Sequence, residues 1–287
     1  MAIRLFRHNP GLVMLPSLAI DVVSGYSHTL LRFAPYLIGM GVVFALLSWV
    51  SPCNAGKPWW DKRGLVTDLC YWFVVPVFSR YGRIGFTVLA TVYLFGINTE
   101  KGILAYYDHG HGPISELPYW WQVGLYLVGT EFVLYWIHRG FHSSRLWRFH
   151  AVHHSTEDLE WVSASRFHPV NLLMGTVLVD VVVLLSGFSP DVFVVMAPFS
   201  LVTSGWVHAN LNWTLGPFKY VLAGPVFHRW HHDKATLGKN FASTFSLFDW
   251  MFGTFYMPEG KLPANYGLIE DTMPKSFGAQ VLYPLVS

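Results

Sequence analysis

Charged residues are scarce in this chain: Asp, Glu, Lys and Arg make up only 13% of its 287 residues, against about 25% in soluble domains. The net charge of +2 is small and the basic residues are scattered, which excludes a nucleic-acid-binding role. The two cysteines, Cys53 and Cys70, form neither a CxxC pair nor a disulfide framework. A dinucleotide fingerprint, an iron–sulfur cysteine set and a haem motif are also missing from these residues.

Apolar residues, in contrast, make up 53% of the chain. The runs with at most one charged residue are 33–50, 84–99, 117–137 and 192–207. Two weaker segments, 64–79 and 169–190, contain Asp68 and Asp180 respectively. Runs of this kind are typical of transmembrane helices, although several are shorter than the ~20 residues that cross a bilayer upright. We therefore predict an all-α integral membrane bundle with four to six spans, in which residues 1–287 form a single membrane-embedded domain.

Three compact histidine clusters stand out against this apolar background. They are His138 and His142 in HRGFH, His150, His153 and His154 in HAVHH, and His228, His231 and His232 in HRWHH. On a helix, positions i, i+3 and i+4 share one face, so each cluster can direct its imidazoles to one point. Neutral imidazole binds iron, zinc, copper and nickel, and eight imidazoles are too many for one ion. The spacing therefore predicts a dinuclear metal centre.

The clusters are expected to share one aqueous face. Segment 117–137 ends at His138, and segment 169–207 can return as a hairpin that bends at residues 186–190. This hairpin brings His208 to the same face, which makes it a candidate ninth ligand. The tail 258–287, rich in glycine and proline, is expected to be irregular and to pack over that face.

The distribution of basic residues gives the predicted orientation. A topology with five crossings places eight arginines on the histidine face: Arg4, Arg7, Arg32, Arg80, Arg83, Arg139, Arg145 and Arg148. It places Lys57, Lys62 and Arg63 on the opposite face. The positive-inside rule then makes the histidine face cytoplasmic, so that a cytoplasmic histidine-rich helical cap covers the bundle.

The segments TEFVLYWIHRGFH, HAVHHS, SRFHP, HAN and FHRWHHDKATLGKNFA resemble the fatty acid hydroxylase superfamily, also called the sterol desaturase family, over about residues 131–254. The resemblance implies that the eight clustered histidines bind two iron ions. With O₂ as cosubstrate, such a centre hydroxylates or desaturates a C–H bond of a membrane lipid, such as a sterol or a fatty acyl chain. By the same resemblance, His208 in HAN and His168 in RFHP are further candidate ligands or neighbours of the ligands. Asn171 stands where the family often has an acidic residue.

Other groups around the centre can be predicted less directly. Six side chains could hold the imidazoles by hydrogen bonds: Glu131, Asn210, Asn212, Asp233, Asn240 and Asp249. No catalytic residue beyond the metal ligands and no organic cofactor is predicted. Electrons are expected from a separate donor, a ferredoxin or a haem cytochrome with its reductase. An acidic donor could dock at a basic set made up of Arg145, Arg148, Lys234 and Lys239.

Three alternatives stay open at this point. The superfamily also includes ether-lipid monooxygenases, and nothing in the residues separates that reaction from hydroxylation of a sterol or an acyl chain. A non-catalytic lipid-binding membrane protein with a structural zinc would use similar ligands. A metal transporter is disfavoured, because its histidines would form a path across the bilayer rather than gather on one face.

Overall fold

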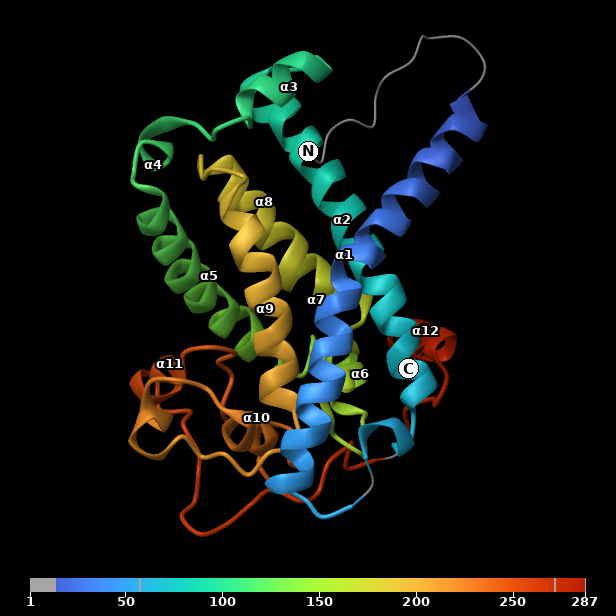
Figure 1. Ribbon diagram of the computed structural model, residues 1–287, viewed down its shortest axis with the longest axis vertical. Helices are drawn as coiled ribbons and strands as arrows, with labels where there is room; N and C mark the ends of the chain where they lie inside the picture. Colours follow the sequence, from blue (N-terminus) through green and yellow to red (C-terminus); the bar gives the residue numbers. More distant parts are fainter. Residues whose placement is uncertain (1–13, 57, 271, 287) are drawn as a thin grey trace.

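The computed structural model describes residues 14–56, 58–270 and 272–286, and every regular element in these ranges is helical (Figure 1). The long helices are α1 (Met14–Val50), α2 (Leu65–Phe95), α5 (Tyr119–Phe141) and α9 (Val192–His208). A further element of the bundle runs without interruption through α7 (Pro169–Leu172), a π-helical turn (Leu173–Val177) and α8 (Leu178–Leu185). The predicted all-α fold is confirmed.

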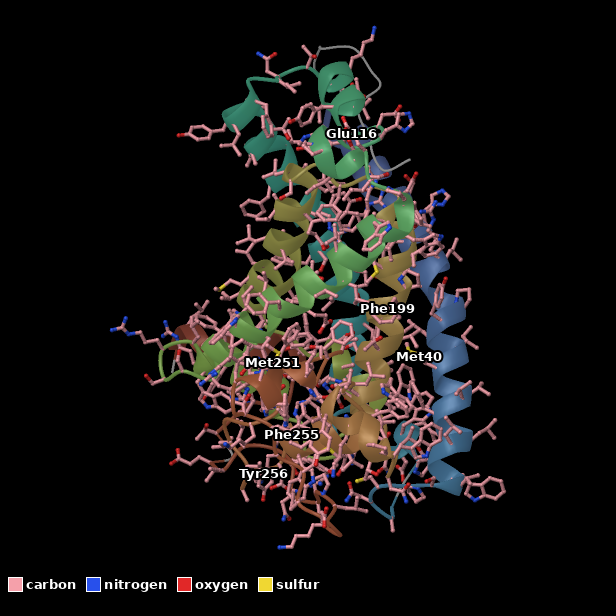
Figure 2. The ribbon with its side chains drawn as sticks, turned by 90° about the vertical axis from the view of Figure 1, so that its left-hand side faces the viewer. Met40, Glu116, Phe199, Met251, Phe255 and Tyr256 are labelled. Carbon is pink, nitrogen blue, oxygen red and sulfur yellow. The ribbon has the colours of Figure 1, made fainter. Side chains whose placement is uncertain are left out.

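Short helices cover the two ends of this bundle (Figure 1). At one end, which we call the far end, lie α3 (Glu100–Tyr106) and α4 (Gly112–Ser115). The opposite end, the histidine end, carries α6 (Trp147–His154), α10 (Pro225–His231), α11 (Leu247–Met251) and α12 (Phe277–Val286). Single 3-10 turns lie at Trp59–Asp61, Trp161–Ser165 and Gly216–Tyr220. Figure 2 shows Glu116 at the far end and Tyr256 at the histidine end.

Helix α2 is one continuous helix where the sequence indicated two segments, 64–79 and 84–99. Two charged residues, Arg80 and Arg83, separate those apolar runs, but both have partners on neighbouring helices. Arg80 Nη1 donates to Thr29 Oγ1 at 2.9 Å, and Arg83 Nη2 lies 2.6 Å from Asp180 Oδ2. Because both side chains have a partner inside the bundle, the helix continues through them without a break.

The single α2 helix changes the predicted topology, because residues 51–64 then lie at the histidine end. Lys62 Nζ donates to Ser163 Oγ at 2.6 Å, and the backbone N–H of Arg63 donates to Asp158 at 2.8 Å. Placing Lys62 and Arg63 on the face opposite the histidines is therefore wrong. Arg80 and Arg83, predicted on the histidine face, lie about 22–27 Å along α2 from its start, by the helical rise. Arg4, Arg7 and Lys57 lie outside the described residues.

Helices α8 and α9 form the predicted hairpin, with its turn at residues 186–190. The turn packs tightly against the far end of the bundle, where the N–H of His111 donates to the carbonyl oxygen of Gly187 at 3.0 Å. Gly187 has φ 96°, and a Cβ there would lie 1.9 Å from the carbonyl oxygen of His111. Glycine is thus required at the bend. The hairpin returns the chain to the histidine end, where α9 terminates at His208.

The tail differs from its prediction in one respect. It lies at the histidine end, as expected, but it contains the ten-residue helix α12. Helix α12 packs on α2 through the rings of Phe277 and Tyr71, whose centroids are 4.8 Å apart. The apolar residues of this helix form a face that packs on the bundle. The glycine and proline content of the whole tail had indicated irregular structure instead.

Apolar side chains also cover much of the outside of the bundle. Phe199 of α9 lies midway between the two ends (Figure 2), and Val194 on the same helix is 71% exposed. By length and composition, one described helix, over Ser24–Val50, is long and apolar enough to cross a bilayer, and Pro169–Leu185 and Val192–His208 are shorter apolar helices. The count of four to six spans therefore stays a prediction.

Candidate metal centre

Nine histidines meet at the histidine end in two groups. The five-histidine group consists of His138, His142, His150, His154 and His231, and the four-histidine group of His153, His208, His228 and His232. Within each group the candidate ligand atoms all lie within 4.8 Å of one another. The structure thus brings together all eight clustered histidines and His208.

Two of the three sequence clusters divide their histidines between the groups. On α6, His150 and His154 are four residues apart and reach the five-histidine group, whereas His153 reaches the other. On α10 the division is reversed, with His231 alone in the five-histidine group. Consecutive helical residues point about 100° apart, so an HxxHH motif serves two adjacent sites. The expectation that each cluster converges on one point holds only for His138 and His142.

Backbone carbonyls orient four of the nine imidazoles through the Nδ1 atom. The pairs are His138 with Phe241 at 2.6 Å, His153 with Arg166 at 3.2 Å, His208 with Ser204 at 2.7 Å and His231 with Lys239 at 2.7 Å. A carbonyl oxygen can only accept, so the proton must sit on Nδ1 and the lone pair on Nε2. His150 Nδ1 makes the analogous contact with Asn171 Oδ1 at 3.3 Å.

The Nε2 atoms that result face one another. His153 Nε2 lies 3.2 Å from His208 Nε2, and His138 Nε2 lies 3.0 Å from His150 Nε2. Two lone pairs at this separation repel unless a cation lies close to both. The buried Nε2 atoms of His142, His154 and His231 likewise have no partner among the described residues. The donor set therefore fits metal ions bound through Nε2.

Burial keeps these imidazoles in the state that a metal requires. Desolvation lowers the pKa of His150, His153 and His231 well below 6.5, and the neighbouring imidazoles lower it further. The same direction and cause apply to the pKa of His154, His228 and His232. Neutral imidazole is the ligand form, so the site is prepared for a metal at neutral pH.

Asp249 and Asn240 support this centre indirectly. Asp249 accepts hydrogen bonds from the N–H groups of Phe241 and Ala242, both at 2.8 Å, and so fixes the carbonyl that holds His138. Asn240 has φ 57° and donates through Nδ2 to the carbonyl of Phe227 at 2.8 Å. Both side chains shape the loop that presents backbone carbonyls to the imidazoles.

The other four predicted supporting residues bind elsewhere. Glu131 accepts from the N–H and hydroxyl of Thr244, and Asp233 from the N–H groups of residues 235, 264 and 265. Asn210 and Asn212 bind the segment after α1, at Asn54 and Ser51. Within the described residues, none of the six candidate side chains bonds an imidazole; backbone carbonyls and Asn171 do so instead.

His168 joins neither group. Its Nδ1 accepts from the N–H of Val170 at 3.1 Å, so it caps the start of α7, and its Nε2 donates to the carbonyl of Val281 in α12 at 3.0 Å. With both ring nitrogens engaged, His168 is a structural residue that joins α7 to the tail. The structure does not place it as a ligand.

A cluster of buried charged side chains near the centre was not predicted from the sequence. Asp68 is fully buried; it accepts from Arg166 Nε at 2.6 Å and pairs with Lys62. Arg166 is also the residue whose carbonyl holds His153. An aspartate inside an apolar segment indicates a buried ion pair in principle. Its partners could not be identified, because they lie six and 98 positions away in the chain.

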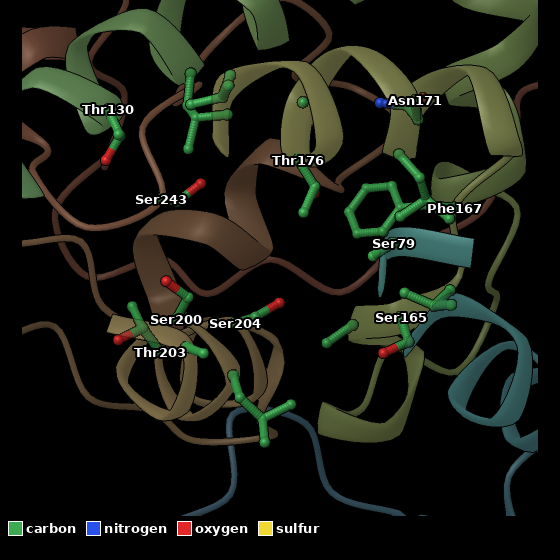
Figure 3. A pocket seen from close by; sticks show the side chains of 18 of the residues that line it. Ser79, Thr130, Ser165, Phe167, Asn171, Thr176, Ser200, Thr203, Ser204 and Ser243 are labelled. Atoms are coloured by element: carbon green, nitrogen blue, oxygen red, sulfur yellow. The ribbon is translucent and has the colours of Figure 1, made fainter. Parts of the chain in front are cut away.

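Two cavities reach the centre from different sides. The first, about 390 Å³, runs between α1, α2, α5, α7–α8 and α9, and five of the nine histidines line it. Figure 3 shows another part of its lining, including Thr130 and Phe167. These five are His138, His150, His153, His208 and His228. The second, about 380 Å³, is lined by His154 and His232 together with Trp147, Arg148 and Lys234. The first cavity suits an apolar substrate, because most of its lining surface is apolar.

Comparison with known proteins shows similarity to one family. The family described as fatty acid hydroxylase matches residues 123–254. The chain is 33% identical to an ornithine lipid hydroxylase of Rhizobium tropici over 61% of this chain and 54% of that protein. It is 34% identical to the alkylglycerol monooxygenase of Xenopus tropicalis over 81% of this chain and 48% of that protein. A very-long-chain aldehyde decarbonylase of Oryza sativa is 32% identical over 48% of this chain and 55% of its own length.

The chain therefore spans about half the length of the curated relatives it matches. No solved structure matches it. The matched region contains all three histidine clusters and His208, so the similarity covers both histidine groups.

Proposed function

Because residues 123–254 of this chain belong to the fatty acid hydroxylase family, we propose that the protein is an integral membrane oxidoreductase that hydroxylates or desaturates a C–H bond of a membrane lipid. The observation that carries this proposal is the set of nine histidines, in two groups, at one end of a largely apolar cavity. Relatives that act as lipid hydroxylases and monooxygenases favour the same chemistry.

The metal in this proposal is iron, with two ions per chain and O₂ as cosubstrate. The five-histidine group would hold one ion and the four-histidine group the other. Ligand sets made only of neutral imidazole suit redox-active transition metals. Iron bound there would supply the O₂ activation that an unreactive C–H bond needs. The carbonyls of Phe241, Arg166, Ser204 and Lys239 keep the ligand nitrogens aimed at the two sites.

The first cavity is the proposed substrate site. Its apolar walls, which include Phe33, Leu37 and Leu134, exclude water and accept a lipid chain. Its histidine-lined end would bring one carbon of that chain close to both metal sites. Hydroxylation and desaturation both begin with removal of a hydrogen from such a carbon, so one cavity serves either reaction.

Exposed aromatic residues support embedding of the bundle in a membrane, for which we propose four to six spans. Trp49 is 85% exposed near the end of α1, at the histidine end of the bundle. Trp120 and Trp121 are 70% and 69% exposed at the start of α5, at the far end. Tryptophan is enriched at both membrane–water interfaces, so these residues would mark the two surfaces of the bilayer.

The basic residues favour a cytoplasmic histidine end. Segment 96–118, at the far end, contains Lys101 as its only lysine or arginine. The histidine end carries Lys62, Arg63, Arg145 and Arg148. Under the positive-inside rule this difference favours a cytoplasmic histidine end. The eight arginines no longer support that orientation, because Arg80 and Arg83 lie far along α2 from the histidine end.

The second cavity is the proposed approach for electrons. It reaches His154 of one group and His232 of the other, whose rings stack with centroids 4.4 Å apart. Arg148 and Lys234 at its rim would attract an acidic ferredoxin or haem cytochrome. The donor and the substrate would then approach the centre from separate sides.

Ether-lipid monooxygenation is the second candidate reaction. The match to alkylglycerol monooxygenase covers 81% of this chain, whereas the match to the ornithine lipid hydroxylase covers 61%. The same cavity could present the carbon beside an ether oxygen to the histidine groups. Incubation with an alkylglycerol and with a fatty acyl lipid, followed by mass spectrometry of the products, separates the two reactions.

The test of the main proposal is metal analysis of protein purified anaerobically from iron-replete cells. We expect two irons per chain, with Mössbauer parameters of a coupled, nitrogen-rich site. One zinc, or no metal in folded protein, would contradict the proposal and favour a non-catalytic lipid-binding protein.

A further inference from the structure

Deep in the bundle, the substrate cavity reaches a cluster of charged and polar side chains that the metal centre does not use. Arg83 of α2, Tyr126 of α5 and Asp180 of α8 line the cavity together with Ser79, one turn before Arg83. Along α5, Tyr126, Thr130, Leu134 and His138 line the cavity at four-residue intervals. Tyr126 and His138 are twelve residues apart, so the cluster lies on the order of 18 Å from the metal centre along the helix.

Both carboxylate oxygens of Asp180 already have partners in this cluster. Asp180 Oδ2 lies 2.6 Å from Arg83 Nη2, and Asp180 Oδ1 accepts from the hydroxyl of Tyr126 at 2.9 Å. The ion pair is therefore electrically balanced. Its two charged members come from different helices, at a depth where ionised side chains are costly and commonly mark functional sites.

Donors, in contrast, are left over. Arg83 Nε and Ser79 Oγ are both buried and have no hydrogen-bond partner among the described residues. Ser79 as a whole is 8% exposed. An unpaired donor buried beside an ion pair is unfavourable unless a bound group completes it. Both residues line the cavity, so a ligand in it would lie beside the two unpaired groups.

We infer that Arg83 and Ser79, supported by Asp180 and Tyr126, form a subsite for an uncharged oxygen acceptor of the substrate, such as a carbonyl or an ether oxygen. Arg83 Nε can only donate and the Ser79 hydroxyl can donate as well, so one acceptor atom of a ligand would satisfy both. Because Asp180 balances the charge of Arg83, the acceptor is neutral rather than a carboxylate or phosphate. Resting on the proposed function, the inference makes the substrate a lipid whose oxygen lies far from the oxidised carbon. The subsite would thereby fix which carbon reaches the histidine groups.

Two probes of equal chain length test the subsite. Equilibrium binding of radiolabelled methyl palmitate and of radiolabelled octadecane is measured on the full chain in detergent, anaerobically and without an electron donor, with protein-free micelles as the blank. We expect at least a tenfold preference for methyl palmitate, the size of one hydrogen bond to a charged donor. Equal binding of the two probes overturns the inference.

Two variants locate the preference. Ser79→Ala removes a donor without touching the ion pair, and Arg83→Lys keeps the charge beside Asp180 but removes Nε. Each should reduce the preference about tenfold while leaving octadecane binding unchanged. The matched control is Arg80→Lys, because the Nε of Arg80 is also unpartnered but Arg80 does not line the cavity. If Ser79→Ala and Arg83→Lys both retain the preference, the inference fails.

The outcome is separable from that of the proposed function, because the assay follows binding and not turnover. A preference that depends on Ser79 and Arg83 in a protein without iron would leave the subsite standing and reject the oxidation chemistry. Lipid oxidation by a two-iron protein that lacks the preference would reject the subsite and leave the oxidation chemistry standing.

Discussion

The two histidine groups differ in how the chain builds them. The five-histidine group uses only histidines of the three sequence clusters, and two of its members, His138 and His142, are only partly buried. The four-histidine group is buried throughout and needs His208, which stands alone in the sequence. The five-histidine group thus draws only on motifs with helical spacing, whereas the four-histidine group also depends on the α8–α9 hairpin, which returns His208 to the histidine end.

The largest expected effect comes from removing one ligand of each group, by His153→Ala and His231→Ala. Each variant should abolish activity and lower the iron content, because the reaction needs both ions, while the protein still inserts into the membrane. Iron per chain, turnover and membrane fractionation are the measurements. His109→Ala, at a side chain 89% exposed outside both groups, is the control. Unchanged iron and activity in both ligand variants would reject the site.

His208→Ala and His142→Ala should affect the two histidine groups to different degrees. Without His208 the four-histidine group keeps three ligands, whereas without His142 the five-histidine group keeps four. We expect His208→Ala to lose one iron and its spectroscopic signal, and His142→Ala to retain both ions with weaker binding. Metal analysis with Mössbauer spectroscopy distinguishes the two. Equal iron loss in the variants would mean that the groups do not act as separate sites.

A smaller effect is expected from Asp249→Asn. The substitution weakens the hold on the N–H groups of Phe241 and Ala242, and so loosens the carbonyl that orients His138. Changes to groups that orient metal ligands typically lower metal affinity about 10–100-fold. Competition with a chelator should therefore remove iron from the five-histidine group first. Asp158→Asn, at a surface pair with Arg63, is the control and should change nothing.

The smallest effect is expected from His168→Ala. Loss of the α7 cap and of the bond to Val281 should lower the free energy of unfolding by about 1 kcal/mol, while iron per chain stays at the wild-type value. Denaturant unfolding and metal analysis measure the two quantities. A loss of iron in this variant would restore His168 as a candidate ligand.

The sequence predicted the helical class and the eight clustered histidines, because helices and the spacing of the clusters both depend on short-range periodicity. It did not predict α2 as one helix, because Arg80 and Arg83 interrupt the apolar sequence. Their partners, Thr29 and Asp180, lie on other helices and are seen only in the structure. The placement of Lys62 and Arg63 failed for the same reason. The groups that orient the imidazoles could not be predicted at all, because a backbone carbonyl such as that of Phe241 or Ser204 has no signature in the sequence.

The sequence by itself determined which residues could bind metal. Imidazoles at i, i+3 and i+4 share a helical face whatever surrounds them. The tertiary structure alone decided how they divide into two groups, that His208 joins one of them and that His168 joins neither. It also decided that a cavity connects the centre to Arg83 and Asp180. These features depend on contacts between residues far apart in the chain, and such contacts are fixed only when the helices pack.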